Sequence, residues 1–377
     1  METPFVFGKI ASEKNFTNRK AEIEKLVSNF TSNVNTILIS PRRWGKSSLV
    51  TKAAQTAARK NKTIRFCFID LNNVRTEEQF YQHFATKILQ ASASKTRTLI
   101  ENARKFLGRF IPSITISPGP GTEFRLGLDW KEVAKEPDEI LNLAEKIATE
   151  NRLKFVVCID EFQNISEFEH PLDLQKKMRA NWQKHLNTSY CMYGSKRHMM
   201  MDVFTSPSMP FYKFGDIIFL NKISSEDWVP FIQKRFSETG KKIGPEDAGL
   251  IPELTDCHPY YVQQLAQQSW LRTEDVCDRK IIHRAFQDLV LQLSMLFQNL
   301  TDSLSNTQIN FLKALIDKVD HLSSQSIIYE YQLGTSANVV KIKSMLTNKE
   351  IIDIHGNKIS FLDPLYKSWL KKYFFNE

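Results

Sequence analysis

The sequence predicts an α/β fold: a largely parallel sheet with helices on both faces, followed by a helical segment and then a small unit of three helices and a hairpin. From Thr36 to about Asp227, short β-branched apolar runs alternate with longer helical stretches, which is typical of a parallel sheet. From Ser225 to about Leu300 this alternation stops, and amphipathic helical patterns dominate. Since the chain has 377 residues and a domain commonly has about 150, we expect two or three domains.

Five mostly apolar segments are predicted to form the strands of the sheet, and their composition predicts burial on both faces. They are Thr36–Ser40, Ile64–Leu71, Lys154–Asp160, Ser189–Tyr193 and Asp216–Leu220. An insertion at about residues 75–150 separates the second strand from the third. It contains helical patterns at Glu77–Ala93 and Thr96–Arg109. Beyond them, Ile114–Ile116 and Glu123–Leu126 flank a Pro-Gly-Pro-Gly segment, and we expect these two runs to form a small hairpin.

The carboxyl-terminal part is predicted to form a helical lid and a winged helix. The lid helices are expected at Asp227–Glu238, Pro245–Thr255, Tyr260–Thr273 and Arg279–Phe297. Three further helices follow: one capped by Ser305-Asn306, one near Gln325 and one at about Ser336–Leu346. The strands Ile351–Ile354 and Lys358–Phe361 then flank the turn Gly356-Asn357. The expected domains are therefore residues 1–224, 225–300 and 301–377.

Composition and charge restrict the class of protein. There are 51 basic and 42 acidic residues, a mild excess that fits either phosphate-binding clusters or an ordinary solvated surface. The sequence shows no secretory signal and no apolar run long enough to span a bilayer, so we expect a cytoplasmic protein without a membrane partner. The five cysteines form no C-x-x-C pair, and the eight histidines show no H-E-x-x-H spacing. Reduced, buried thiols and no zinc site are therefore expected.

The segment after the first strand is typical of a phosphate-binding loop. Its residues are Pro41, Arg42, Arg43, Trp44, Gly45, Lys46, Ser47 and Ser48, and a helix begins directly after Gly45-Lys46-Ser47. In such a P-loop, backbone N–H groups and the positive end of the helix face the β-phosphate, Lys46 reaches the β- and γ-phosphates, and Ser47 binds Mg²⁺. Ser40 replaces the first glycine of G-x-x-x-x-G-K-[ST], which would strain the loop if that position required a positive φ. The alternative is a chance Gly-Lys-Ser at a helix start.

Two acidic residues end the third strand. Asp160 is predicted to hold Mg²⁺ through water, and Glu161 to orient and polarise the water that attacks the γ-phosphate. The alternative is a simple helix cap. After the next strand, Ser195 is a candidate sensor of the γ-phosphate, and its alternative is a cap for the helical segment Lys196–Met201.

These motifs resemble the archaeal-type P-loop ATPases of the AAA-like, signal-transduction STAND group, which also occur in bacteria. The resemblance covers most of the chain and includes the Pro-Arg-Arg sequence of the P-loop and Cys-Ile-Asp-Glu-Phe-Gln around Asp160. It implies that the amino-terminal motif Phe16-Thr-Asn18-Arg19 lies near the adenine. It also implies a carboxyl-terminal winged helix, in agreement with the pattern of helices and hairpin.

The same resemblance extends to Asp256-Cys-His258-Pro259-Tyr-Tyr, which is similar to the family's Gly-His-Pro-Tyr-Tyr motif in the lid. It implies that Pro259 lies against the base and His258 near the phosphates. Cys257 stands at the position of the family's glycine. From the residues alone, a histidine at a helix start is a capping or packing residue as readily as a ligand.

The predicted function is an ATPase switch in which ATP·Mg²⁺ and ADP stabilise different arrangements of the lid and the winged helix, with slow hydrolysis resetting them. A second hypothesis is a DNA-binding regulator with a degenerate nucleotide site, whose helix Ser336–Leu346 would present Asn338, Lys341 and Lys343 to a groove. A third is a scaffold for a protein partner or for self-association, with nucleotide as a structural ligand.

Overall fold

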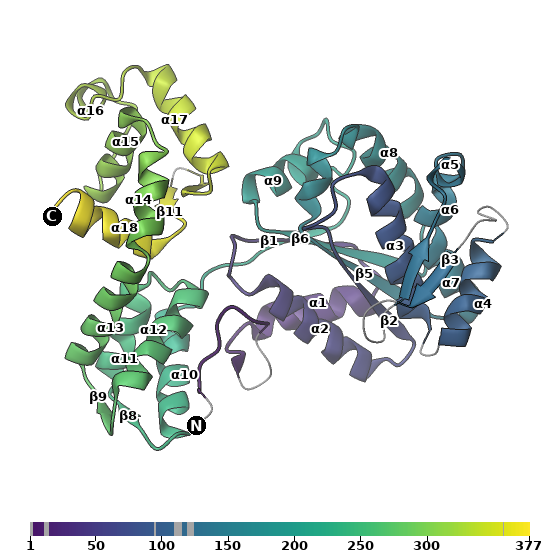
Figure 1. The fold of residues 1–377 in the computed structure, drawn as a ribbon, viewed down its shortest axis with the longest axis horizontal. Coiled ribbons are helices and arrows are strands. Elements are labelled where there is room, and N and C mark those ends of the chain that lie inside the picture. Colours follow the sequence, from purple (N-terminus) through teal and green to yellow (C-terminus); the bar gives the residue numbers. More distant parts are fainter. Residues whose placement is uncertain (1–2, 11–14, 94–95, 109–114, 119–123, 357) are drawn as a thin grey trace. The chain divides into compact units, whose positions relative to one another are not determined.

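The computed structural model describes residues 3–377 except 11–14, 94–95, 109–114, 119–123 and 357 (Figure 1). The chain forms two compact units. One contains Arg19–Asn221, and the other joins the amino-terminal segment up to Asn18 to Lys222–Glu377.

The unit Arg19–Asn221 is built on a five-stranded parallel sheet. Its strands lie in the order β2-β5-β6-β1-β7. They are β1 (Thr36–Ile39), β2 (Ile64–Asp70), β5 (Lys154–Asp160), β6 (Thr188–Gly194) and β7 (Asp216–Phe219), which confirms the five predicted strands. Burial on both faces is confirmed for β1, β5 and β6 and is wrong for the edge strands β2 and β7. Phe68 on β2 is 41% exposed, because an edge strand has a neighbour on one side only.

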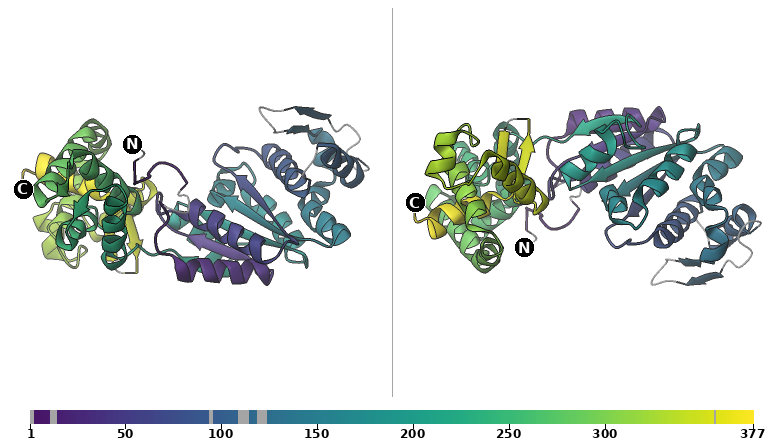
Figure 2. Two further views of the ribbon diagram at one scale, coloured as in Figure 1. Left: turned by 90° about the horizontal axis from the view of Figure 1, so that it is seen from below. Right: turned by 90° about the horizontal axis from the view of Figure 1, so that it is seen from above.

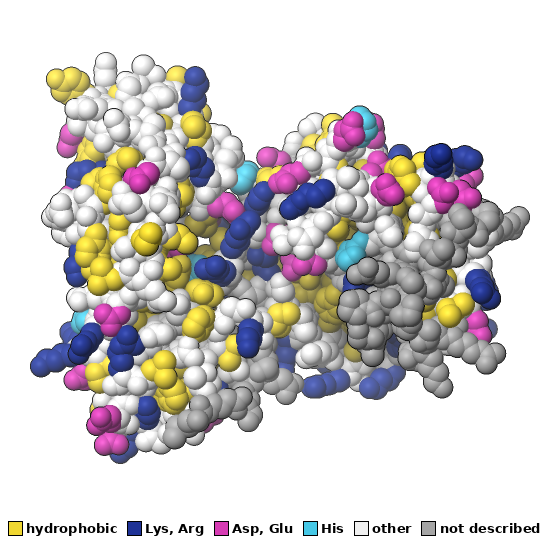
Figure 3. All heavy atoms as spheres, in the orientation of Figure 1, with side chains coloured by type: hydrophobic (Ala, Val, Ile, Leu, Met, Phe, Trp, Pro, Cys, Tyr) yellow, Lys and Arg dark blue, Asp and Glu magenta, His cyan; other side chains and the backbone are white. Residues whose placement is uncertain are grey.

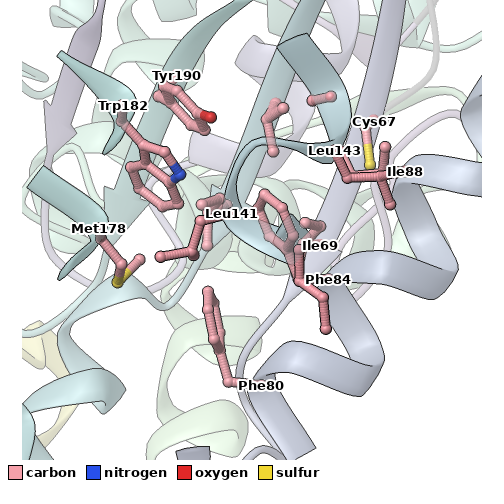
Figure 4. Close-up of a cluster of buried hydrophobic side chains, with 14 of the residues drawn as sticks. Cys67, Ile69, Phe80, Phe84, Ile88, Leu141, Leu143, Met178, Trp182 and Tyr190 are labelled. Carbon is pink, nitrogen blue, oxygen red and sulfur yellow. The ribbon is translucent and has the colours of Figure 1, made fainter. Parts of the chain in front are cut away.

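Helices cover both faces of this sheet (Figure 2). They include α1 (Lys20–Thr31) and α2 (Lys46–Lys60), which contact each other, and α3 (Glu77–Ser92), α7 (Leu143–Asn151), α8 (Pro171–Trp182) and α9 (Arg197–Thr205). The larger core forms where α3, α7 and α8 pack on the sheet (Figure 4). Within it the indole of Trp182 stacks on the ring of Tyr190 with centroids 3.9 Å apart. This contact packs the end of α8 against the amino-terminal half of β6.

The insertion between β2 and β5 contains the two predicted helices, α3 and α4 (Thr96–Phe106), and the predicted hairpin. The hairpin pairs β3 (Thr115–Pro118) with β4 (Phe124–Gly127). The outer residues predicted for these elements, Arg109, Ile114 and Glu123, lie outside the described residues. Short helices α5 (Trp130–Val133) and α6 (Pro137–Leu141) precede α7. They were not predicted, because four or five residues are too few to show a helical period.

The other unit begins with the helices of the predicted lid, α10 (Ser225–Ser237), α11 (Pro245–Leu254), α12 (Pro259–Arg272) and α13 (Arg279–Gln292). A short parallel bridge joins β8 (Lys242–Ile243) to β9 (Val276–Cys277). The single helix predicted at Arg279–Phe297 is wrong, since the chain leaves the helical conformation at Leu293 and restarts as α14 (Ser294–Asp302). No glycine or proline marks this break. The amino-terminal segment packs on α10, where Phe5 lies 5.7 Å from Phe236 between ring centroids.

The last elements form the predicted winged helix. They are α15 (Asn306–Ile316), α16 (Gln325–Glu330), α17 (Ser336–Asn348), the antiparallel strands β10 (Ile352–His355) and β11 (Lys358–Phe361), α18 (Pro364–Trp369) and a final π-helical turn, η3 (Leu370–Phe374). Ser305 and Gln308 form a reciprocal capping box at the start of α15, which confirms the predicted cap. Of the predicted turn, Asn357 lies outside the described residues. Within the described ranges, every helix is too short or too polar to cross a membrane.

Candidate nucleotide site

The loop between β1 and α2 turns by placing two residues in the left-handed region. Arg43 has φ 62° and Gly45 has φ 86°. Ser40 is not left-handed, so the strain considered for a serine at the first motif position does not arise. A Cβ on Gly45 would meet no atom within 4 Å, which means that its φ, and not crowding, favours glycine. Alternation of right- and left-handed residues ahead of a helix turns successive N–H groups inward and forms an anion-binding concavity.

Lys46 begins α2 and is buried at 6% exposure. Its Nζ donates to the carbonyl oxygens of Ser40 at 3.3 Å and Pro41 at 3.1 Å. The ammonium therefore lies inside the curve of the loop. Arg42 and Arg43 are exposed. Trp44, Ser47 and Ser48 are half-buried.

The two predicted magnesium ligands meet although 113 positions separate them. Ser47 Oγ donates to Asp160 Oδ2 at 2.7 Å, and the Glu161 N–H donates to Asp160 Oδ1 at 2.9 Å. Burial raises the pKa of Asp160 to about 6, although the Ser47 hydrogen bond and the charge of Lys46 act in the opposite direction. The buried carboxylate is thus short of nearby positive charge, which a divalent cation would supply.

The composition of this ligand set fits magnesium better than zinc or calcium. Among the described residues, no group of three or more His, Cys, Asp or Glu side chains could hold a metal ion. Mg²⁺ typically uses one or two carboxylates, with waters and phosphate oxygens completing its octahedron. One carboxylate and one hydroxyl beside a phosphate-binding loop match that demand.

We predict that Asp160→Asn stabilises the nucleotide-free protein. The folded-state pKa of about 6 exceeds the usual 3.8, so this group's contribution to stability is most favourable at low pH and is lost as pH rises through about 6. An asparagine mimics the protonated form: its Oδ1 accepts from the Glu161 N–H, and its amide donates to Ser47 Oγ. The gain at pH 7.5 should be about 2 kcal/mol in urea unfolding without metal, and should shrink towards pH 5. A variant less stable than wild type at pH 7.5 would contradict this.

Glu161 follows β5 in the left-handed conformation, with φ 51°. It stands at the N-cap position of the 3₁₀ helix η2 (Phe162–Glu167), but its side chain makes no cap hydrogen bond. The carboxylate instead accepts at Oε2 from Ser195 Oγ at 2.8 Å and from Gln163 Nε2 at 2.5 Å. Burial raises the pKa of Glu161, but these hydrogen bonds and the charge of Lys46 outweigh it and hold the pKa below its usual value. Glu161 is therefore ionised at neutral pH.

Ser195 reaches this carboxylate from the end of β6. The helix that follows, α9, has Lys196 at its N-cap, and no side chain caps it. The structure thus shows the Glu161 contact in place of the capping alternative. Gln163 was not predicted as a site residue. The sequence signal for it is its place at the end of the Cys-Ile-Asp-Glu-Phe-Gln motif, two positions after the acidic pair.

The remaining predicted site residues are divided between the two units. Arg19 belongs to the unit of the P-loop, is buried, and forms an ion pair with Glu22 at 3.0 Å. Phe16 and Asn18 belong to the other unit, where Asn18 Nδ2 donates to Asp227 Oδ2 at 2.6 Å. The predicted places of all three near the adenine stay predictions.

His258 and Pro259 also lie in the second unit, where Pro259 begins α12. The His258 ring is buried, and its centroid lies 4.9 Å from that of Tyr261. Cys257 has φ 52°, so it adopts the left-handed conformation that a glycine would take more easily. Proximity of His258 and Pro259 to a nucleotide stays a prediction.

Comparison with known proteins agrees with this architecture. The family described as "Probable winged helix domain" matches residues 295–372. The Walker-type ATPase PABY2304 of Pyrococcus abyssi has a similar structure, with a TM-score of 0.68, 18% identity, and 97% of this chain and 99% of that chain covered. The ORC2 protein of Aeropyrum pernix in ADPNP-ADP complexes gives 0.56 at 13% identity, over 96% and 94%. No curated protein matches the sequence.

A third similar structure is the ORC1 protein of Aeropyrum pernix in complex with DNA, with a TM-score of 0.50, 13% identity, and 100% and 99% of the two chains covered. At these identities the similarity is one of fold. The fold is that of a P-loop ATPase with a carboxyl-terminal winged helix.

Proposed function

We propose that this chain binds ATP with Mg²⁺ and hydrolyses it slowly, as an AAA/STAND-type switch that couples nucleotide state to the arrangement of lid and winged helix. The observation that carries the proposal is the hydrogen bond between Ser47 and Asp160. It joins the start of α2 to the end of β5, beside a loop whose lysine is already turned inward. These are the groups that a nucleoside triphosphate and its metal require.

Each side chain has a role that follows from its contacts. Lys46 would exchange the carbonyl oxygens of Ser40 and Pro41 for β- and γ-phosphate oxygens. Ser47 and Asp160 would hold Mg²⁺, which when bound neutralises phosphate charge. Glu161, ionised and fixed at one oxygen, would orient the attacking water, and Ser195 would link that carboxylate to the end of β6.

The direct test is phosphate release from ATP by the purified full chain, with Mg²⁺ and with EDTA. Magnesium-dependent release that exceeds that of a Lys46→Ala preparation supports the proposal. Coupling to the lid and the winged helix is tested by limited proteolysis with ATP·Mg²⁺ and with ADP, where different cleavage patterns are expected. Equal release by both preparations would remove the enzymatic interpretation.

The winged helix suggests DNA as a second partner, since this motif can place a helix in a groove. Of the three α17 residues considered for that role, Lys341 is exposed, whereas Lys343 is half-buried. Asn338 is half-buried too, and its Nδ2 donates to the Leu333 carbonyl at 2.7 Å. Val340, on the exposed side, is 65% exposed. In Figure 3, Lys and Arg side chains are interspersed with Asp and Glu. These observations favour a protein partner or self-association over DNA for this helix.

We therefore predict weak duplex binding with a shallow salt dependence. Each neutralised phosphate adds about 0.9 to the slope of log affinity against log salt, and a face with one exposed lysine should give a slope of magnitude below about 3. A fluorescence anisotropy titration of duplex DNA at several salt concentrations measures it, with Lys341→Ala as the matched variant. A steep slope that falls in Lys341→Ala would instead support the DNA-binding regulator.

A further inference from the structure

The amide of Gln163 is buried against the Glu161 carboxylate. Gln163 is 1% exposed and lies on η2, the helix that begins directly after the acidic pair. A carboxylate can only accept hydrogen bonds, so the side of the amide that faces Glu161 must be the donor Nε2. Its Oε1 has no hydrogen-bond partner among the described residues. An unpaired buried carbonyl destabilises the folded state, so fold stability alone gives a poor reason for a glutamine here.

Gly194, the last residue of β6, makes room for this amide. A Cβ at position 194 would lie 1.9 Å from Gln163 Oε1 and 3.0 Å from its Cδ. The φ of Gly194 is not in the left-handed region, so backbone conformation does not demand glycine. The close approach of the Gln163 amide does. The next residue, Ser195, donates to the same carboxylate oxygen, so the end of β6 both leaves space for one donor and supplies the other.

We propose that Gln163, seated against Gly194, is a positioning residue that acts with Ser195 to hold Glu161 by Oε2 and leaves Oε1 for the attacking water. Both donors reach Oε2, and among the described residues no hydrogen bond is made to Oε1. This inference rests on the proposed ATPase function and adds to it a role for Gln163, to which the resemblance assigns none. A carboxylate pinned at one oxygen keeps the other at a fixed place, which is the requirement for orienting a nucleophile.

The first experiment removes the donor and keeps the volume. Gln163→Met should lower kcat by about 10- to 100-fold, because loss of orientation affects the chemical step. KM and the affinity for a fluorescent ATP analogue should stay near wild type. Gln175→Met is the matched control: Gln175 is also 1% exposed with an unpaired Oε1, but it lies on α8. A kcat within about twofold of wild type for Gln163→Met, or an equal loss in Gln175→Met, would overturn the proposal.

The second experiment uses Gly194 to move the amide. Gly194→Ala should lower kcat in the wild-type background, because the new methyl group displaces the Gln163 amide. In a Gln163→Ala background the same substitution should have little further effect, because the space is already vacated. The Met200 Sδ, 2.8 Å from the same Cβ position, is present in both backgrounds, so its displacement cancels in the comparison. An equal loss in kcat from Gly194→Ala in both backgrounds would contradict the proposed packing of Gln163 against Gly194.

A stability cycle separates this inference from the ATPase proposal. The free energy of unfolding of the nucleotide-free protein is measured for Gly194→Ala, Gln163→Ala and the double variant. If Gly194→Ala destabilises the protein less in the Gln163→Ala background than in wild type, the packing of the Gln163 amide against Gly194 is confirmed without any measurement of turnover. A second cycle, with Gln163→Ala and Glu161→Ala, measures the contact between amide and carboxylate in the same way, because each single variant removes one partner of the hydrogen bond. If both cycles show coupling but the protein has no magnesium-dependent turnover, the ATPase proposal is refuted and the contacts of Gln163 are confirmed. If the protein hydrolyses ATP but the effects of the paired substitutions on unfolding are additive, the role of Gln163 is refuted and the ATPase proposal stands.

Discussion

Lys46→Ala is expected to abolish ATP binding and turnover. The Lys46 ammonium is buried in the curve of the P-loop, where it donates to the carbonyl oxygens of Ser40 and Pro41. A triphosphate that enters the same curve brings negative charge into a site that already contains the carboxylates of Asp160 and Glu161. Without the ammonium, only the backbone N–H groups and Mg²⁺ would balance that charge. The loss in turnover should be at least about 100- to 1000-fold, the size found when one preorganised donor is removed.

The measurement for Lys46→Ala pairs titration of a fluorescent ATP analogue with phosphate release. Lys60→Ala is the matched control, because Lys60 is an exposed lysine in the last turn of the same helix, α2. It should bind and hydrolyse ATP like wild type. Lys46→Met, which keeps the apolar stem, shows whether the loss follows the charge or the packing. Retained binding in both Lys46 variants would mean that the anion site lies elsewhere.

The sequence predicted the central part of this site because its signals are local. A strand, a loop with Gly45 and Lys46, and a helix follow one another directly, and Asp160 ends another apolar strand. Carboxyl ends of parallel strands meet at one edge of a sheet, so proximity of Ser47 and Asp160 follows from topology once the strands are known. The five strands themselves were predictable because the central ones are continuous apolar runs.

Features that depend on tertiary context were not predicted. The exposure of β2 depends on its place at the edge of the sheet, and the residues of β2 alone do not show which place the strand takes. The break at Leu293 lies in a segment with apolar residues on several sides, where periodicity cannot show where a helix ends. The contact between Gln163 and Glu161 depends on the space left by Gly194, a residue 31 positions further along the chain. Such a fit between two elements has no local signature.

Glu161→Gln is expected to bind ATP and to hydrolyse it about 100- to 1000-fold more slowly than wild type. Glutamine has the shape of glutamate, and its Oε1 can take the place of the oxygen that accepts from Ser195 and Gln163. The phosphate-binding loop, Ser47 and Asp160 are unchanged, and one negative charge is removed, so ATP affinity should be equal or higher. The amide nitrogen would then stand where the carboxylate offered an acceptor to water. Because an amide cannot take a proton or orient water as a carboxylate does, the loss should lie in kcat.

Single-turnover phosphate release and nucleotide binding, measured on the same preparation, separate these two effects of Glu161→Gln. Glu167→Gln is the matched control, because Glu167 belongs to the same η2 segment but its carboxylate forms an ion pair with Lys196, at 2.8 Å. It should leave turnover unchanged. Slow hydrolysis with retained binding in Glu161→Gln, set beside lost binding in Lys46→Ala, assigns the two residues to the chemical step and to substrate capture. If Glu161→Gln turns over ATP at the wild-type rate, the water is oriented by another group, and Oε1 of Glu161 has no part in the reaction.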